Sequence, residues 1–239
     1  MQSVDLTLPT PEQNLACDEA LLEWCEQGHG EELLRFWESP EYFVVLGYSG
    51  KAASEVNLSA CRKTRVPVLR RCSGGGAVVQ GPGCLNYSLI LQIADRAALR
   101  GITETNCFVM RRHREVLESI VGAEIAVQGF TDLALGGRKF SGNSQHRKRR
   151  FLLFHGTLLL DFDIPRMDEL LPLPSRQPAY RQNRSHGDFL TNLNAPASVI
   201  EEALKSSWNV TGTLDKIPVG KIDELVARRY GREEWNFKF

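Results

Sequence analysis

The 239-residue chain lacks an excess of charge of either sign, because lysine plus arginine and aspartate plus glutamate both total 29. This balance gives no global indication of binding to nucleic acid or to an anionic membrane. No apolar run approaches the roughly 18 residues that a spanning helix needs. Residues 1–13 also lack the basic and apolar segments of a secretory signal. We therefore expect a cytoplasmic protein with neither membrane nor nucleic acid as partner.

The cysteines lack a ligand pattern. No CxxC pair and no cysteine–histidine spacing typical of zinc sites is present, so no metal site is assigned. In a cytoplasmic protein the thiols should be reduced. The six cysteines are Cys17, Cys25, Cys61, Cys72, Cys84 and Cys107.

Hydrophobic residues make up 42% of the chain and charged residues 24%, which predicts a packed core. Thr10-Pro11-Glu12-Gln13 has the cap, the first-turn proline and the capping-box glutamine of a helix start, and this helix should end near Gly28. Further helices are expected at 104–121, 197–208 and 221–230, the first burying Cys107, Met110, Leu117 and Ile120. Strands are expected at 32–38, 42–49, 66–71, 85–94, 123–127, 131–135, 138–142 and 151–162.

Gly136-Gly137 should form a hairpin turn between two of these strands. Helices and strands do not alternate regularly along the chain. This favours an α+β fold over a doubly wound parallel sheet.

Residues 70–79, Arg-Arg-Cys-Ser-Gly-Gly-Gly-Ala-Val-Val, combine two arginines with three successive glycines. Glycines lose much conformational freedom on folding, so such a run needs a reason. Without Cβ atoms, peptide N–H groups can line a concave site for an anion, and arginine adds fork-shaped donors. The stretch matches neither a Walker loop nor a GxGxxG turn. A glycine-rich hairpin between two strands is the alternative.

Two more segments carry candidate chemistry. Lys139 lies in a short strand among glycines, where it could reach a phosphate or carboxylate; a solvated lysine on an edge strand is the alternative. His155 precedes Gly156 inside an apolar strand, where a hydrogen-bonded core histidine is the alternative.

Together these motifs resemble the lipoate–protein ligase A family, within the wider biotin/lipoate ligase superfamily. The RRxSGGGxV pattern is matched at residues 70–78, the GRKxxG pattern at 137–142 and the HGTLLL pattern at 155–160. Residues 14–49 also resemble the family's first helix and strands. The resemblance implies a mixed, largely antiparallel sheet flanked by helices, in the biotin/lipoate ligase (class II aminoacyl-tRNA synthetase-like) fold, with residues 1–239 as one catalytic domain.

The activity that the resemblance implies uses ATP and Mg²⁺ to convert lipoate (or octanoate) to an acyl-adenylate. The acyl group then passes to one lysine of a lipoyl carrier domain. Such carriers are the E2 subunit of 2-oxoacid dehydrogenases, the glycine-cleavage H protein or another lipoate-binding protein. The resemblance implies that Lys139 is catalytic and bridges the acyl carbonyl and the α-phosphate, where positive charge stabilises the developing anion.

The resemblance also implies binding residues. Contacts to lipoate or lipoyl-AMP are expected from Arg71, Ser73, Gly74, Gly75, Gly76, Ala77, Asn86, His155, Gly156 and Thr157. Nucleotide contacts are expected from Val78, Gly83, Asp132, Lys139, Gly142 and Ser144. The apolar strands at 85–90 and 151–160 should form the wall of the acyl-chain slot.

An acyltransferase of the same superfamily is the nearest alternative. It moves octanoyl from acyl carrier protein through a cysteine thioester and needs no ATP. Its cysteine lies shortly before the lysine, where this chain has Gly129, although Cys72 and Cys84 flank the glycines. Gln80 replaces a histidine that ligases often carry, and the following Gly-Pro-Gly turn resembles the transferase branch. A biotin ligase is less favoured, because its GRGRxG-type loop is missing.

Two basic segments have open roles. Residues 145–150, Gln-His-Arg-Lys-Arg-Arg, could form a mobile loop, lie over the nucleotide or meet an acidic carrier domain; without flanking aromatics, nucleic acid is disfavoured. Arg181, Arg184 and His186 follow a proline-rich loop and could contact phosphate or the carrier, or belong to a surface loop capped by Asp188. Many ligases carry a small carboxy-terminal domain. We expect this chain to work alone or with a separate accessory protein.

Overall fold

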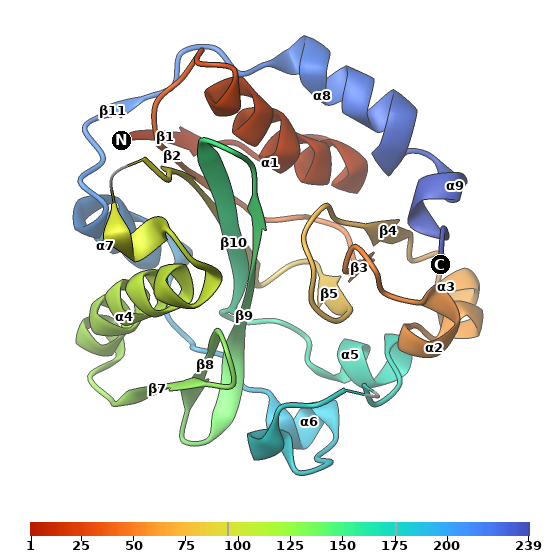
Figure 1. The fold of residues 1–239 in the computed structure, drawn as a ribbon. Helices are drawn as coiled ribbons and strands as arrows, with labels where there is room; N and C mark the ends of the chain where they lie inside the picture. The colour runs from red at the N-terminus through yellow and green to blue at the C-terminus, as the bar shows by residue number, and fades with distance from the viewer. Residues whose placement is uncertain (95, 175) are drawn as a thin grey trace.

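The computed structural model describes residues 1–94, 96–174 and 176–239, and an eight-stranded sheet forms its centre (Figure 1). The strand order is β11-β1-β2-β6-β10-β9-β8-β7. Pairs from β2 to β7 are antiparallel, whereas β1 pairs in parallel with β2 and β11. The predicted α+β class, with its mixed and largely antiparallel sheet, is confirmed. The strands are β1 (Gln2–Asp5), β2 (Leu33–Trp37), β6 (Cys84–Gln92), β7 (Ile125–Gln128), β8 (Asp132–Leu135), β9 (Arg138–Arg147), β10 (Phe151–Leu159) and β11 (Gly212–Thr213).

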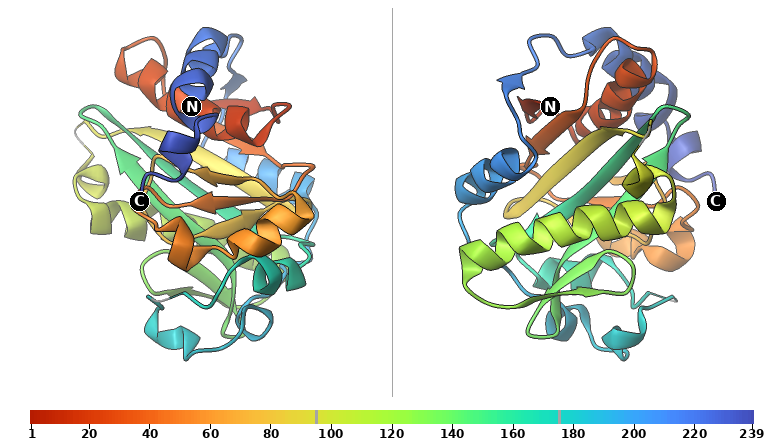
Figure 2. Two further views of the ribbon diagram at one scale, coloured as in Figure 1. Left: turned by 90° about the vertical axis from the view of Figure 1, so that its right-hand side faces the viewer. Right: turned by 60° about the vertical axis from the view of Figure 1, so that its left-hand side comes forward.

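Helices cover both faces of this sheet (Figures 1 and 2). On one face, α4 (Ile102–Val121) and α7 (Ala197–Ser207) pack against apolar side chains of the strands. On the other, α1 (Pro11–Glu26) and α8 (Val219–Leu225) form a second core with β2, β6 and β10. The capping box of α1 is confirmed, since Thr10 and Gln13 exchange side-chain to backbone hydrogen bonds.

A small sheet lies beside the large one, in the order β4 (Val68–Arg70), β3 (Phe43–Leu46), β5 (Val78–Gln80). The segment with the three glycines joins β4 to β5, which lie on opposite sides of β3. It is therefore a crossing loop, and the hairpin alternative is wrong. Short helices pack around this sheet: α2 (Ala52–Glu55), α3 (Leu58–Thr64), α5 (Pro165–Leu170) and α6 (His186–Phe189).

The basic run is part strand and part turn. Strand β9 continues to Arg147, and a tight turn leads into β10. Lys148 forms a 3.0 Å ion pair with Glu23, and the Arg150 N–H donates to Glu26. Acidic side chains of α1 therefore contact this turn, and the first half of the run belongs to a strand and not to a loop.

Two other expectations need correction or extension, and one is confirmed. Cys107 is exposed, because the buried stripe of α4 follows Thr105, Val109, Met110, His113 and Leu117. The last predicted helix divides into α8 and a π-helical turn over Val226–Tyr230, followed by α9 (Glu233–Asn236). The Gly136-Gly137 turn between β8 and β9 is confirmed, with positive φ at both residues. In the described part of the chain, no helix is long and apolar enough to cross a membrane.

His113 gives the fold a testable pH dependence. Its ring is buried in α4 and accepts a hydrogen bond from Trp208 Nε1, and burial lowers its pKa to about 3. Above the unfolded-state pKa of about 6.5, the ring is neutral in both the native and the unfolded state, and its low native pKa does not affect stability. Below that pH, the unfolded chain takes up a proton that the native chain cannot. Stability should therefore fall as the pH drops from 6.5 toward 3.

Between pH 7 and pH 5, the His113→Gln variant should lose about 2 kcal/mol less unfolding free energy than the wild type. Urea titrations at the two pH values measure this difference. Equal losses in both proteins would contradict the assignment.

Candidate active site

A cavity of about 1040 Å³ lies between the glycine segment, one face of the central strands and the segment 171–181. Most residues predicted for substrate, nucleotide or catalysis line it. They are Arg71, Gly74, Gly75, Gly76, Ala77, Val78, Asn86, Asp132, Lys139, Gly142, Ser144, His155, Gly156 and Thr157. Segments far apart in the sequence therefore meet at one place.

The register of the sheet explains this convergence. Thr157 of β10 pairs with Asn86 of β6 on one side and with Gly142 of β9 on the other. Because paired residues in neighbouring strands share a face, all three point toward the cavity. His155 and Ser144, two residues along their strands, lie in the next row of the same face.

The glycine loop (Ser73–Ala77) is folded around the Arg71 guanidinium. Nη2 donates to the carbonyl oxygens of Gly74 and Gly76, at 2.5 and 3.0 Å, and Nε donates to Ser73 Oγ at 3.1 Å. Nη1 donates to the Val45 carbonyl. Burial lowers the Arg71 pKa to about 10, so the side chain stays charged at neutral pH. Arg71 lines the cavity, but its N–H groups donate to the loop and its neighbour strand and not into the cavity.

The Gly74 and Gly76 carbonyl groups turn toward Arg71, and the amide N–H groups of the three glycines are left free. Among the described residues, the N–H groups of Gly74, Gly75 and Gly76 donate to no protein acceptor. Gly75 has φ +94°, and a Cβ there would approach Arg71 Nη2 to 2.7 Å. Gly47 of the neighbouring strand end leaves room for the Gly75 carbonyl, which a Cβ would strike. Side-chain-free backbone thus forms a set of unpaired donors at the cavity wall, as anion-binding nests do.

Lys139 enters the cavity from β9. Its Nζ forms a 2.8 Å ion pair with Asp132 Oδ1, and a quarter of the side chain is exposed. The other oxygen of Asp132 accepts a 2.8 Å hydrogen bond from the Tyr180 hydroxyl, whose pKa is raised by burial and by this carboxylate. Gly142 makes room for the ammonium, since a Cβ there would lie 2.8 Å from Nζ. The Asp132 carboxylate thus positions the Lys139 ammonium at the cavity.

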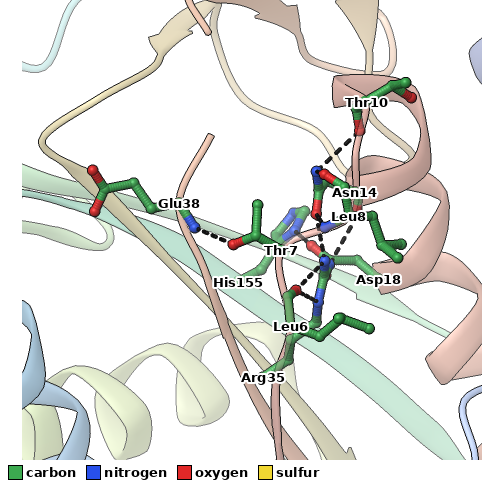
Figure 3. A network of polar contacts seen from close by, with 9 residues as sticks. All are labelled: Leu6, Thr7, Leu8, Thr10, Asn14, Asp18, Arg35, Glu38 and His155. Atoms are coloured by element: carbon green, nitrogen blue, oxygen red, sulfur yellow. Dashed lines mark hydrogen bonds and ion pairs between the residues drawn. The ribbon is translucent and has the colours of Figure 1, made fainter. Parts of the chain in front are cut away.

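His155 connects the glycine loop to helix α1, which packs on the same face of the sheet. Its Nε2 lies 2.6 Å from Ser73 Oγ, and its Nδ1 lies 3.4 Å from Asp18 Oδ2. Asp18 also accepts a 2.7 Å hydrogen bond from the fully buried guanidinium of Arg35 (Figure 3). Ser73 is only 1% exposed and is not among the residues that line the cavity; its hydroxyl contacts His155 and Arg71.

Gly83 does not line the cavity. Its N–H donates to Glu38, and its carbonyl accepts from the backbone N–H groups of Leu160 and Asp161. A Cβ there would strike the Asp161 carbonyl, and φ is +78°. The glycine is explained by this turn before β6, and the structure does not bring it to the other predicted nucleotide residues.

Described residues of the proline-rich segment line the cavity, while others of the segment stay exposed at the surface. Arg181 and His186 are buried and line the cavity, and Asp168 accepts a hydrogen bond from the His186 ring. The Arg184 guanidinium holds the Gly137 and Tyr180 carbonyls outside it. The cap of α6 is Ser185 and not Asp188: the Ser185 hydroxyl accepts from the Asp188 N–H and donates to the Asp188 carboxylate. Ser175, in the same segment, lies outside the described residues.

Several site residues had no role in the sequence interpretation. Asp18 and Arg35 lie in the predicted first helix and strand, and a charged residue inside the apolar run Leu-Leu-Arg-Phe-Trp was the available signal. Asn143 takes up the space beside Gly156, where a Cβ would strike its amide oxygen. Tyr180 carried no signal, because only the fold brings it to Asp132.

No cysteine lines the cavity in the described part of the chain. Cys72 and Cys84, which flank the glycine loop in sequence, are buried, and burial raises the pKa of each thiol to about 12. A buried thiol with a raised pKa is a poor nucleophile, because the thiolate is the reactive form. Nor do the described residues contain a group of three or more histidine, cysteine, aspartate or glutamate side chains placed to hold a metal ion.

Thiol labelling tests this burial. In the native protein at pH 8, a disulfide reagent such as DTNB should label Cys107 rapidly and leave Cys72 and Cys84 unlabelled until denaturant is added. The Cys107→Ser variant is the control and should lose the fast phase. Rapid native labelling of Cys72 or Cys84, identified by mass spectrometry, is the contrary result.

Two named proteins are similar in sequence to this chain. A "Probable lipoate-protein ligase A" of Mycoplasma pneumoniae is 29% identical over 99% of this chain and 72% of its own length. An "Octanoyltransferase LipM" of Halalkalibacterium halodurans is 25% identical over 95% of both chains.

Two solved structures share the fold. A lipoate-protein ligase A bound with ATP superposes with a TM-score of 0.81 at 23% identity, over 99% of both chains. The bi-partite lipoate protein ligase of Thermoplasma acidophilum, studied with its E2 lipoyl domain, gives 0.80 at 23% identity, over 99% of this chain and 96% of that one. The family model described as the lipoyl protein ligase A/B catalytic domain matches residues 10–205. Since that match spans most of the sequence, the chain belongs to the lipoyl protein ligase A/B catalytic domain family.

Proposed function

We propose that the protein is a lipoate–protein ligase that activates lipoate or octanoate with ATP and transfers the acyl group to a lysine of a carrier domain. One observation supports this above all. The unpaired amides of Gly74–Gly76 and the Lys139 ammonium line one cavity, which has no cysteine among its described lining residues. Donors and a cation placed together suit an acid joined to a phosphate, and the missing thiol argues against a thioester route.

The first step brings two anions together. The acid's carboxylate attacks the α-phosphorus of ATP, an oxygen–phosphorus bond forms, and pyrophosphate leaves. In this proposal the glycine amides receive the carboxylate and α-phosphate oxygens, because they have no protein acceptor to give up. Donors fixed before the reaction cost no reorganisation as charge develops, which is the source of their catalytic effect.

Lys139 acts in the same step by changing partner. It starts paired with Asp132, which Tyr180 holds in place. The negative α-phosphate would attract the ammonium, which would then contact both an α-phosphate oxygen and the acyl carbonyl oxygen. Asp132 would keep its hydrogen bond from Tyr180. The acyl chain would lie beside Asn86 and Thr157, against apolar lining residues that include Leu15, Val45 and Val79.

Magnesium would accompany ATP. The cavity offers no all-protein cage, but Mg²⁺ is commonly held by substrate phosphates with one or two carboxylates. Asp132, the carboxylate beside Lys139, is the residue that fits this part. The ion supplies neutralisation of phosphate charge.

The second step transfers the acyl group to an acceptor amine, with AMP leaving. The Thermoplasma ligase studied with an E2 lipoyl domain supports a lipoyl carrier as acceptor. The bi-partite character of that enzyme also supports a separate accessory protein for this chain. The octanoyltransferase relative keeps the ATP-independent transfer as the alternative to test.

ATP dependence separates the two functions. The purified protein, given ATP, Mg²⁺ and lipoate or octanoate, should release pyrophosphate and then modify an apo-lipoyl domain, as mass spectrometry of the domain can show. Octanoyl-carrier protein without ATP should give no product. Modification from octanoyl-carrier protein alone, with none from the free acids and ATP, would establish the transferase instead.

Lys139→Met should lower acid-dependent ATP–pyrophosphate exchange by about 10²–10³-fold, the usual effect of removing one fixed charge-stabilising group. Arg138→Gln is the matched control, since Arg138 is the exposed neighbour in the same strand and lines no part of the cavity. It should keep near wild-type exchange. Similar exchange rates in both variants would remove Lys139 from the mechanism.

A further inference from the structure

Asp18 lies at one end of a buried hydrogen-bond chain that reaches the glycine loop. Its side chain receives Arg35 at 2.7 Å on one oxygen and faces His155 Nδ1 at 3.4 Å with the other. The opposite ring nitrogen of His155 lies 2.6 Å from the Ser73 hydroxyl, and Arg71 Nε lies 3.1 Å from that same hydroxyl. The chain therefore ends on the guanidinium that holds the loop carbonyls.

Asp18 selects the proton arrangement of this chain. The Ser73 oxygen accepts from Arg71, but with a second lone pair and one proton the hydroxyl can pair with either state of His155 Nε2. An ionised Asp18 can only accept, which places the ring proton of the neutral imidazole on Nδ1 and leaves Nε2 to accept from the Ser73 hydroxyl. Burial alone would raise the pKa of Asp18, but the Arg35 charge and the contact with His155 hold it below its ordinary value. An ionised Asp18 is the acceptor that this Nδ1–H requires.

Ser73, His155 and Asp18 thus have the order of a hydrolase triad, but not its access. The serine is 1% exposed and does not line the cavity, and its oxygen is already occupied by Arg71. A substrate cannot reach it as a nucleophile in this arrangement. These hydrogen bonds can instead fix the position of the glycine loop relative to α1.

We propose that Asp18 is a positioning residue for acyl-adenylate formation, an inference that rests on the function proposed above. By fixing the His155 tautomer, Asp18 keeps the Ser73 hydroxyl donating to His155 and its oxygen accepting from Arg71. Arg71 then holds the Gly74 and Gly76 carbonyls, so that the amides face the substrate. Without the carboxylate, the other tautomer donates to Ser73, whose oxygen then accepts from both His155 and Arg71. The Ser73 hydroxyl proton must turn to a different acceptor, and the contact that supports Arg71 changes.

The tautomer can be measured without any activity. In ¹⁵N-labelled wild-type protein at pH 8, the ring shifts of His155 should show a protonated Nδ1 and an unprotonated Nε2. In Asp18→Asn, the amide group can donate to Nδ1, and the proton should move to Nε2. The Nε2–H tautomer in the wild type, or the same tautomer in both proteins, overturns the proposal.

Kinetics test the consequence for the reaction. Asp18→Asn should lower kcat of acid-dependent ATP–pyrophosphate exchange by about 100-fold, as small misplacements of reacting groups do, with little change in either KM. The Asp18→Asn/Ser73→Ala double variant should be no slower than Ser73→Ala, because the two residues act through one chain.

Asn14→Ala is the matched control. Asn14 lies one turn earlier on α1 and accepts a 2.7 Å hydrogen bond from Arg35, but it does not contact His155. This variant should unfold at lower urea and keep near wild-type kcat. Equal kcat losses in Asp18→Asn and Asn14→Ala would reduce Asp18 to a structural role. If the wild type forms no adenylate at all, the proposed function fails, and the tautomer measurement still decides this inference.

Discussion

The Arg71 guanidinium and the carbonyl groups around it are the interaction on which the site depends. All three of its nitrogens donate to oxygens of the glycine loop or its neighbour strand, so the Gly74 and Gly76 carbonyls face the guanidinium. The N–H groups of Gly74, Gly75 and Gly76 have no acceptor within the described protein. Loop glycines allow this because Gly75 needs a positive φ and space for Nη2. The Arg71 cation thus orients the glycine backbone so that its N–H groups can receive an anion.

The large sheet supplies the other half of the site by its register. Asn86, Thr157 and Gly142 form one row across three strands, and His155 and Ser144 form part of the next. The Ser144 hydroxyl donates to the Gly74 carbonyl at 3.0 Å, which docks the glycine loop on β9. A slip of one residue in β9 or β10 would turn these side chains to the opposite, apolar face. Strand register is therefore as much a part of the site as the side chains.

The sequence alone predicted the fold class, the capping box of α1 and the glycine turn between β8 and β9, because these depend on local patterns. It also singled out the three motifs that meet at the cavity. It could not place Asp18 or Tyr180, whose partners are far away in the chain and are set only by packing. Ser73 and Gly83 were assigned to ligand contacts, yet their own contacts are with protein groups. Motif membership does not separate a residue that touches a ligand from one that supports such a residue.

The central claim is that the free glycine amides and Lys139 act on one acyl-phosphate group. A crystal structure with a non-hydrolysable acyl-adenylate analogue, an acyl sulfamoyl adenosine, tests it most directly. The account predicts that its sulfamoyl and carbonyl oxygens accept hydrogen bonds from amides of Gly74–Gly76, and that Lys139 leaves Asp132 to contact the same group. An analogue bound with its sulfamoyl group away from the glycine loop, while Lys139 stays on Asp132, would contradict the account.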